Sequence, residues 1–284
     1  MPGYRLNAVL SLVLLPLANA MGHLAPGVGA AWAAVGRPLI DYPVLLLTFS
    51  VHALADSYDK WKDMPRHARP STRLWLMWVG SLLTLLLGAT YQCGFHVARR
   101  LLFFLAGELL WPTPSVPFYS PGKGLRLVKL KDVFGAGKSA FCGFCAGWMD
   151  VNPATVRACG LYPSLCSSGD VRLRSLAYSV LYNFLRETVC DARDVVEDEE
   201  EGVMTLPIAL GRRGTMLLLT VVVILGDIVI TGDLSVESLL RATFALAMSH
   251  VVRKQPRENG LAWACLALFL LLPVLWGQVR LVDS

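Results

Sequence analysis

Long apolar segments recur along the whole chain, which indicates that the chain lies in a lipid bilayer. Hydrophobic residues make up 55% of the 284 residues, and charged residues make up only 17%. A helix needs about 20 apolar residues to cross the hydrocarbon core of a bilayer, and fewer where small residues or tilt help. The strongest candidate spans are residues 6–21, 39–54, 74–97, 215–231, 235–252 and 261–279.

Three weaker apolar segments carry charged residues. They are residues 101–111, 133–151 and 176–190, and the charges are Glu108, Lys138, Arg186 and Glu187. An ionisable group at membrane depth is costly and usually faces a protein-lined cavity, so these positions are candidates for function. Counting every segment predicts an all-α polytopic membrane bundle of about nine transmembrane helices, formed by residues 1–284 as a single integral membrane domain.

The N-terminal apolar stretch allows a second interpretation, because it is short enough to imitate a cleaved or targeting segment. Apolar segments continue from there to Trp276. We therefore take this stretch as the first span.

Two sets of three aspartates share one spacing, and each set lies where an apolar segment ends. They are Asp56, Asp59 and Asp63 in ADSYDKWKD, and Asp191, Asp194 and Asp198 in DARDVVED. Positions i, i+3 and i+7 of a helix fall within roughly 60° of one another, so each set is predicted to form one carboxylate face.

Six like charges stay close together only when cations hold them. Mg²⁺ binds through one or two carboxylates together with phosphate oxygens of a substrate. The pattern therefore predicts that all six aspartates bind metal at a metal–diphosphate site, and that Asp59, Asp63, Asp191 and Asp194 are catalytic. The alternative is that each aspartate is a solvated loop carboxylate.

The distribution of basic residues predicts the orientation in the membrane. Most lysines and arginines, such as Lys60, Arg66 and Arg193, fall in the loops on the same side as the two aspartate sets. Basic residues concentrate in cytoplasmic loops, so both sets are predicted to face the cytoplasm. Binding to nucleic acid is excluded, because these residues are dispersed among membrane loops and form no compact basic domain.

At this point the motifs resemble a known family, the UbiA-type intramembrane prenyltransferases. The stretch RETVCDARDVVEDEEEGVMTLPIALG (residues 186–211) is similar to their second aspartate motif, in which D-x-x-D-x-x-x-D precedes an acidic turn, a glycine and T-L-P. ADSYDKWKDMPRHARP (residues 55–70) is similar to the first motif. FYSPGKGLRLVKLKD (residues 118–132) is similar to the basic connection before the fifth helix. The resemblance covers residues 38–279.

This resemblance implies a helical bundle of two related halves around a central cavity, each half delivering one aspartate motif. It also implies Mg²⁺ as cofactor, an isoprenyl diphosphate as donor, a hydrophobic aromatic or lipid acceptor, and contact with membrane lipid. The positions that match basic residues of its diphosphate-binding loops, or lie near them, are Arg69, Lys123, Arg126 and Lys131. Two alternatives stay open, a terpene cyclase acting on the same donor and a catalytically silent membrane homologue.

The chain departs from the family pattern at Ala55, where the first motif usually has asparagine. Other residues keep two interpretations each. His52 is a core histidine or a ligand, Asn183 extends the second carboxylate face, and Lys138 either reaches a diphosphate or pairs with a carboxylate. Cys159 and Cys166 could form a disulfide.

Overall fold

The computed structural model is a bundle of long helices, and it describes residues 10–120, 124–232, 234–254 and 269–282. The first half contains a π-helical turn η1 (Leu10–Leu14), α2 (Leu15–Gly22), α3 (Leu24–Val35), α4 (Tyr42–Asp63), η2 (Arg66–Ala68), α5 (Thr72–Cys93) and α6 (Phe95–Leu110). A hairpin of β1 (Pro114–Ser120) and β2 (Gly124–Lys129), with α7 (Leu130–Phe134) and η3 (Gly135–Gly137), follows. The second half contains α8 (Lys138–Leu161), η4 (Pro163–Leu165), α9 (Gly169–Arg193), α10 (Val195–Glu201), α11 (Leu206–Thr231), α12 (Val236–Arg253), η6 (Phe269–Leu271) and α14 (Leu272–Arg280).

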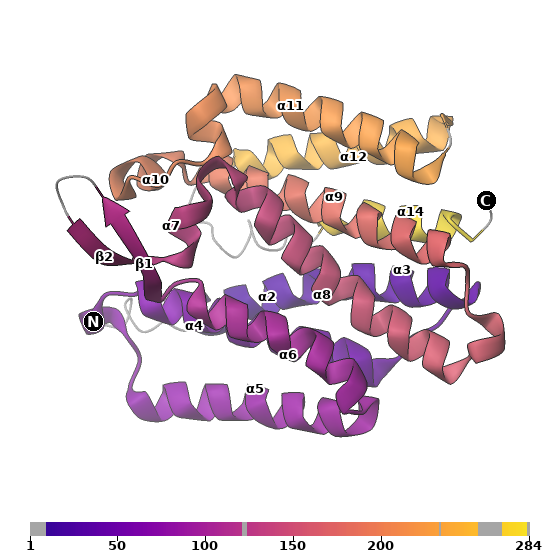
Figure 1. The fold of residues 1–284 in the computed structure, drawn as a ribbon, viewed down its shortest axis with the longest axis horizontal. Coiled ribbons are helices and arrows are strands. Elements are labelled where there is room, and N and C mark those ends of the chain that lie inside the picture. The colour runs from indigo at the N-terminus through magenta and orange to yellow at the C-terminus, as the bar shows by residue number, and fades with distance from the viewer. Residues whose placement is uncertain (1–9, 121–123, 233, 255–268, 283–284) are drawn as a thin grey trace.

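Successive long helices run in opposite directions, so segments that are distant in the sequence meet at each end of the bundle. The end of α4, the end of α6, the hairpin, the start of α8 and the end of α9 with α10 all lie at the left in Figure 1. The opposite end carries the turns after α3, α5, α8 and α11. Both aspartate sets therefore lie at the same end of the molecule, as the sequence predicted.

Two hydrophobic core clusters hold the bundle together. One is built from buried residues of α2–α6 and α8, such as Leu47, Leu82 and Met149. The other is built from α9, α11, α12, η6 and α14, such as Tyr182, Leu219 and Leu270. Each aspartate set thus belongs to a helix with its own core, α4 in the first cluster and α9 in the second.

Three helices are long and apolar enough to cross a membrane by length and composition. They are Leu12–Val35, Thr72–Cys93 and Leu206–Thr231, and Phe269–Arg280 is a shorter apolar helix. The α5 helix lies at one margin of the bundle in Figure 1 and exposes Leu76, Met77 and Leu87, as expected of a surface that faces lipid. The predicted spans 39–54, 101–111, 133–151, 176–190 and 235–252 fall mainly in α4, α6, α8, α9 and α12, which carry more polar or charged residues. Residues 261–268 of the last predicted span lie outside the described residues.

Only part of the first predicted span, residues 6–21, can be compared, because residues 6–9 lie outside the described residues. The apolar helix runs from Leu12 to Val35, with α3 following α2 directly. Its C-terminal half, α3, consists largely of glycine and alanine, small residues that let neighbouring helices approach closely. These helices pack against α4, α8 and α14, which agrees with the interpretation as a span.

The hairpin was not predicted. Its strands are antiparallel, with Phe118 opposite Arg126 and Tyr119 opposite Leu125, and Gly124 adopts a left-handed backbone at the turn. It occupies the segment that the sequence had marked only as a basic connection. The rest of the chain described here follows the all-α prediction.

The helices α8 and α9 approach so closely that only glycine fits between them. A Cβ atom on Gly143 would lie 2.6 Å from the backbone nitrogen of Phe184, and one on Gly147 would lie 2.8 Å from that of Val180. At the far end of α8, Cys159 and Cys166 form the disulfide that the sequence allowed. These contacts fix the position of the helix that leads to the second aspartate set.

Candidate active site

The first aspartate set lies on one unbroken helix. Asp56, Asp59 and Asp63 are all within α4, with Asp63 as its last residue. The Ser57 hydroxyl, next to Asp56, donates to the Leu12 carbonyl at 3.1 Å and accepts from the Trp78 indole at 3.0 Å. The helix is therefore anchored to η1 and α5 at the level of the first aspartate. The Asp63 side chain lies outside the described residues.

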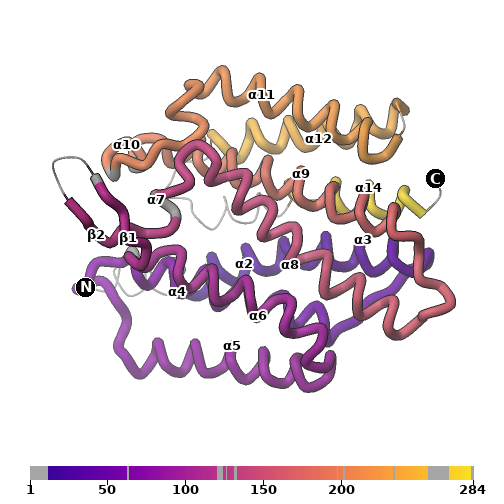
Figure 2. The backbone as a smooth tube through the Cα atoms, viewed as in Figure 1, coloured from indigo at the N-terminus to yellow at the C-terminus, as the bar shows by residue number. Residues whose placement is uncertain are grey.

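The second aspartate set lies at a break between two helices, whereas the sequence predicted one face of a continuous helix. Asp191 is in the last turn of α9, Asp194 is the residue between α9 and α10, and Asp198 is in α10. The Asp194 carbonyl accepts from the Asp198 amide at 3.0 Å, so the chain bends without losing its hydrogen bonding. Figure 2 shows this bend at the same end as the hairpin.

Two aspartates of the second set are already paired with cationic side chains. Asp191 accepts from Lys138 Nζ at 2.9 Å and from the Ser139 hydroxyl at 2.6 Å, both at the start of α8. Asp194 accepts two hydrogen bonds from Arg193, at 2.7 and 2.8 Å. For Lys138 the structure shows the carboxylate pairing, one of its two sequence interpretations.

Lys60 on α4 interacts electrostatically with residues of both aspartate sets. Asp56 raises the pKa of its ammonium group above the ordinary value, burial opposes this, and Asp59 adds to the increase. From the other helix, Arg193 lowers this pKa and Asp194 raises it. Because charges on both α4 and α9 act on this group, the ends of the two helices that carry the aspartates lie near each other. Nothing in the sequence separates Lys60 from the other lysines near the aspartates.

Glu108, near the end of α6, adds a further carboxylate to this end of the bundle. It interacts electrostatically with Asp56 and Asp59 on α4 and with Glu187 and Arg186 on α9. Arg186 pairs with Glu187 and donates to Asn19 at 2.6 Å. The charges predicted to mark function in the weak spans thus converge on the space between the aspartate sets.

The four predicted diphosphate contacts have different outcomes. Arg69 folds back on the end of α4, where it donates to the carbonyls of Met64 and Lys62 and stacks over the Trp61 ring. Its observed role is to cap that helix end. Lys123 and the side chains of Arg126 and Lys131 lie outside the described residues.

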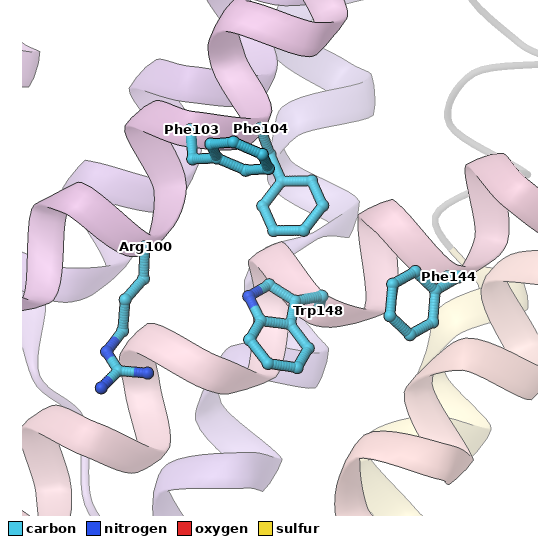
Figure 3. Close-up of a pocket in the computed structure, with 5 residues that line it drawn as sticks. All are labelled: Arg100, Phe103, Phe104, Phe144 and Trp148. Carbon is cyan, nitrogen blue, oxygen red and sulfur yellow. The ribbon is translucent and has the colours of Figure 1, made fainter.

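A separate apolar pocket of about 300 Å³ opens between α6 and α8 (Figure 3). Phe103 and Phe104 face Trp148 across it, and Phe144 and Arg100 complete its lining. Its aromatic walls suit a hydrocarbon chain better than a diphosphate. Arg100 is engaged with Asn152 at 3.0 Å.

Deeper in the bundle, a buried polar cluster joins four helical segments. Asp150 on α8 contacts His23 at the α2–α3 junction, His52 on α4 and Asn183 on α9, at 3.0–3.2 Å. The sequence pointed to His52 and Asn183 separately, as positions that precede the aspartates on their helices. It gave no signal that His23 and Asp150 join them, because these residues are distant in the chain.

Comparisons with known proteins identify the family and the fold of the chain. The family model described as VviA prenyltransferase matches residues 6–281. The chain belongs to the VviA prenyltransferase family. The resemblance to UbiA-type prenyltransferases and the assignment as a prenyltransferase are thereby confirmed. No curated protein sequence matches the chain.

Three solved structures share the fold of this family member. A UbiA homolog from Archaeoglobus fulgidus bound to Cd²⁺ superposes with a TM-score of 0.57 at 11% identity, covering 98% of this chain and 100% of that one. An apo UbiA homolog from Aeropyrum pernix K1 gives 0.54 at 16% identity, covering 97% and 98%. A structure described as digeranylgeranylglyceryl phosphate synthase in membranes gives 0.53 at 16% identity, covering 97% and 99%. Together with the apolar helices, these matches make the chain a multi-pass integral membrane protein of the UbiA fold.

Proposed function

We propose that this prenyltransferase transfers a prenyl group from an isoprenyl diphosphate to a hydrophobic aromatic or lipid acceptor within the membrane, and that the reaction requires Mg²⁺. The observation that carries the proposal is the position of Lys60, which interacts with Asp56 and Asp59 of one motif and with Asp194 of the other. Two carboxylate sets that face one space, with cations between them, suit the binding of a diphosphate through metal ions.

The donor atoms at this end fit Mg²⁺. All of the proposed ligands are carboxylate oxygens, which a hard divalent cation prefers. Asp191 already accepts from Lys138 and Ser139, and Asp194 accepts from Arg193, but a carboxylate offers about four lone-pair sites and keeps room for a metal. We propose Asp56, Asp59, Asp63, Asp191, Asp194 and Asp198 as the ligand set.

When bound, Mg²⁺ would neutralise the negative charge that gathers on the leaving diphosphate. The cationic groups Lys60, Lys138 and Arg193 act on the same charge, and we infer that they bind the diphosphate oxygens or hold the carboxylates in place. A site between helices excludes water, which strengthens these interactions and protects the allylic cation from premature capture. Arg69, Lys123, Arg126 and Lys131 remain proposed contacts of the diphosphate.

We further propose that the aspartate end of the bundle lies at the cytoplasmic face. The support is the excess of lysine and arginine in the loops at that end. A charged donor then reaches the aspartates from the aqueous side, while its chain enters the apolar interior.

The proposal is tested by incubating purified protein in detergent with Mg²⁺ and geranylgeranyl diphosphate, with and without candidate aromatic and lipid acceptors. We expect diphosphate release and a prenylated acceptor, and loss of both in EDTA, because the carboxylates otherwise repel the donor. Release with a hydrocarbon product in the absence of acceptor would indicate a terpene cyclase instead. No release under any of these conditions would identify a silent homologue, and unchanged turnover in EDTA would remove the metal from the mechanism.

A further inference from the structure

The buried cluster around Asp150 has a hydrogen-bonding pattern that fixes the protonation of its histidines. His23 Nδ1 lies 3.1 Å from both carboxylate oxygens, and His52 Nε2 lies 3.0 Å from Oδ1. Asn183 donates to Oδ2 at 3.2 Å. An ionised carboxylate only accepts, so each neutral histidine must place its N–H toward Asp150 and its lone pair on the opposite ring nitrogen.

The cluster consequently holds more acceptor atoms than donors. His23 Nε2 and Asn183 Oδ1 are buried, and none of the described residues donates to either atom. Asp150 and Asn183 have no exposed surface, and the two imidazole rings stack at 3.7 Å. Buried acceptors without a donor are costly, so the cluster departs from the full hydrogen-bond satisfaction expected of a purely structural core.

The cluster lies about one helical turn before the first aspartate set on α4 and about two turns before the second set on α9. His52 is four residues before Asp56, about 6 Å along α4, and Asn183 is eight residues before Asp191, about 12 Å along α9. The polar stripes that begin at the two sets therefore meet at Asp150. These distances match the first few carbons of a donor chain whose diphosphate is held by the aspartates.

The ring geometry argues against a metal ion in the cluster, although the ligand atoms lie within 4.8 Å of one another. The two imidazole planes are only 4° from parallel. Lone pairs in parallel planes do not converge, so one ion cannot lie about 2.0–2.1 Å from both nitrogens and in line with both rings.

We propose that the pair Asp150–His52 is the proton acceptor of the reaction, with His23 and Asn183 as positioning residues. This inference rests on the proposed function. His52 lies four residues before Asp56 on the same helix, and it retains 6% exposure where His23 retains 1%. Asp150 holds its tautomer and stabilises the imidazolium that forms, as the carboxylate does in a catalytic triad.

The proton is transferred to His52 after the new bond to carbon has formed. The allylic C–O bond breaks and its electron pair leaves with the diphosphate. An electron pair of the acceptor, or of a double bond in the donor chain, then forms the new bond to the cationic carbon. The resulting cation loses a proton from carbon or oxygen to His52 Nδ1, and the bonding electrons that remain restore the neutral product.

The experiment compares His52→Gln with His96→Gln, which changes an exposed histidine on α6. Diphosphate release from geranylgeranyl diphosphate and the product mixture are measured together. We expect His52→Gln to release diphosphate within about threefold of wild type, while proton-loss products fall at least about tenfold and alcohols from water capture increase. His96→Gln should match wild type. Asp150→Asn, which favours the opposite tautomer, should act in the same direction as His52→Gln.

Any other result would contradict either the assignment of the proton acceptor or the proposed function. Unchanged products in His52→Gln and Asp150→Asn, with normal release, would place the proton acceptor elsewhere. Loss of release in both variants, with normal thermal unfolding, would show that the cluster supports ionisation or structure and would overturn the proposal. One zinc ion per chain in wild type, lost in His52→Gln, would show that the cluster is a metal site. Absence of release in wild type would instead contradict the proposed function.

Discussion

The two aspartate sets share one spacing but are supported in different ways. The first is on the continuous helix α4, whose neighbour α5 lies at the margin of the bundle and exposes much of its apolar surface. The second is at the break between α9 and α10, where α9 is enclosed by other helices and Asp191 and Asp194 are already paired with cations. Identical spacing therefore does not imply identical surroundings.

The difference suggests how the two sets divide their work. The second set is held in place by Lys138, Ser139 and Arg193 before any ligand arrives. The first set depends on the position of α4, which is anchored through Ser57 to Leu12 and Trp78. Substitutions in each set separate these contributions.

The largest expected effect comes from removing one carboxylate in each set. We expect Asp59→Ala and Asp194→Ala each to lower turnover by at least about a hundredfold, comparable to losing one strong electrostatic stabiliser. Turnover is measured by diphosphate release at saturating Mg²⁺, with membrane insertion as the control. If only one variant loses activity, the aspartate removed in the other variant is not needed for turnover, and the two sets are not equivalent.

The next effect tests the packing of the helix that leads to the second set. We expect Gly147→Ala to destabilise the protein by about 1–3 kcal/mol, because the added Cβ meets the backbone of Val180. Gly88→Ala on α5 is the matched control, since no atom lies within 4 Å of its added Cβ. The two are compared by thermal unfolding in detergent. Equal melting temperatures would contradict the tight contact between α8 and α9.

The smallest expected effect concerns Ala55, which is buried on α4 next to Asp56. If the first set is merely weakened by the missing asparagine, Ala55→Asn should raise turnover by about one order of magnitude, roughly 1.4 kcal/mol. If the site is adapted to another substrate, the rate stays flat or the products shift. Ala55→Leu, similar in size but without an oxygen donor, is the control. Lower turnover in Ala55→Asn with unchanged products would contradict both interpretations.

The sequence predicted what depends on local pattern. The spacing of the aspartates and the apolar segments placed both sets at one end of a helical membrane bundle. Cys159, near the end of α8, pairs with Cys166 after η4, as the sequence allowed. It did not predict the break at Asp194, because D-x-x-D-x-x-x-D is equally compatible with a continuous helix. It also missed α3, because the candidate spans left out this segment rich in glycine and alanine.

Long-range contacts were beyond the sequence for a different reason. Arg69 was predicted to contact diphosphate, and only the structure shows that it caps the end of α4. His23 and Asp150 are 127 residues apart, and nothing local marks them as partners. Such contacts depend on how helices from both halves pack, which periodicity does not encode.

The glycines that face α9 have a consequence for how the cavity changes size. Besides Gly143 and Gly147 on α8, a Cβ on Gly226 of α11 would meet Leu181 and one on Gly277 of α14 would meet Tyr178. The helix α9 is therefore packed too closely against α8, α11 and α14 to move toward them. A longer donor or a bulkier acceptor has to find its volume on the side of α4, α5 and α6, so differences in chain-length preference among related enzymes should trace to residues on those helices.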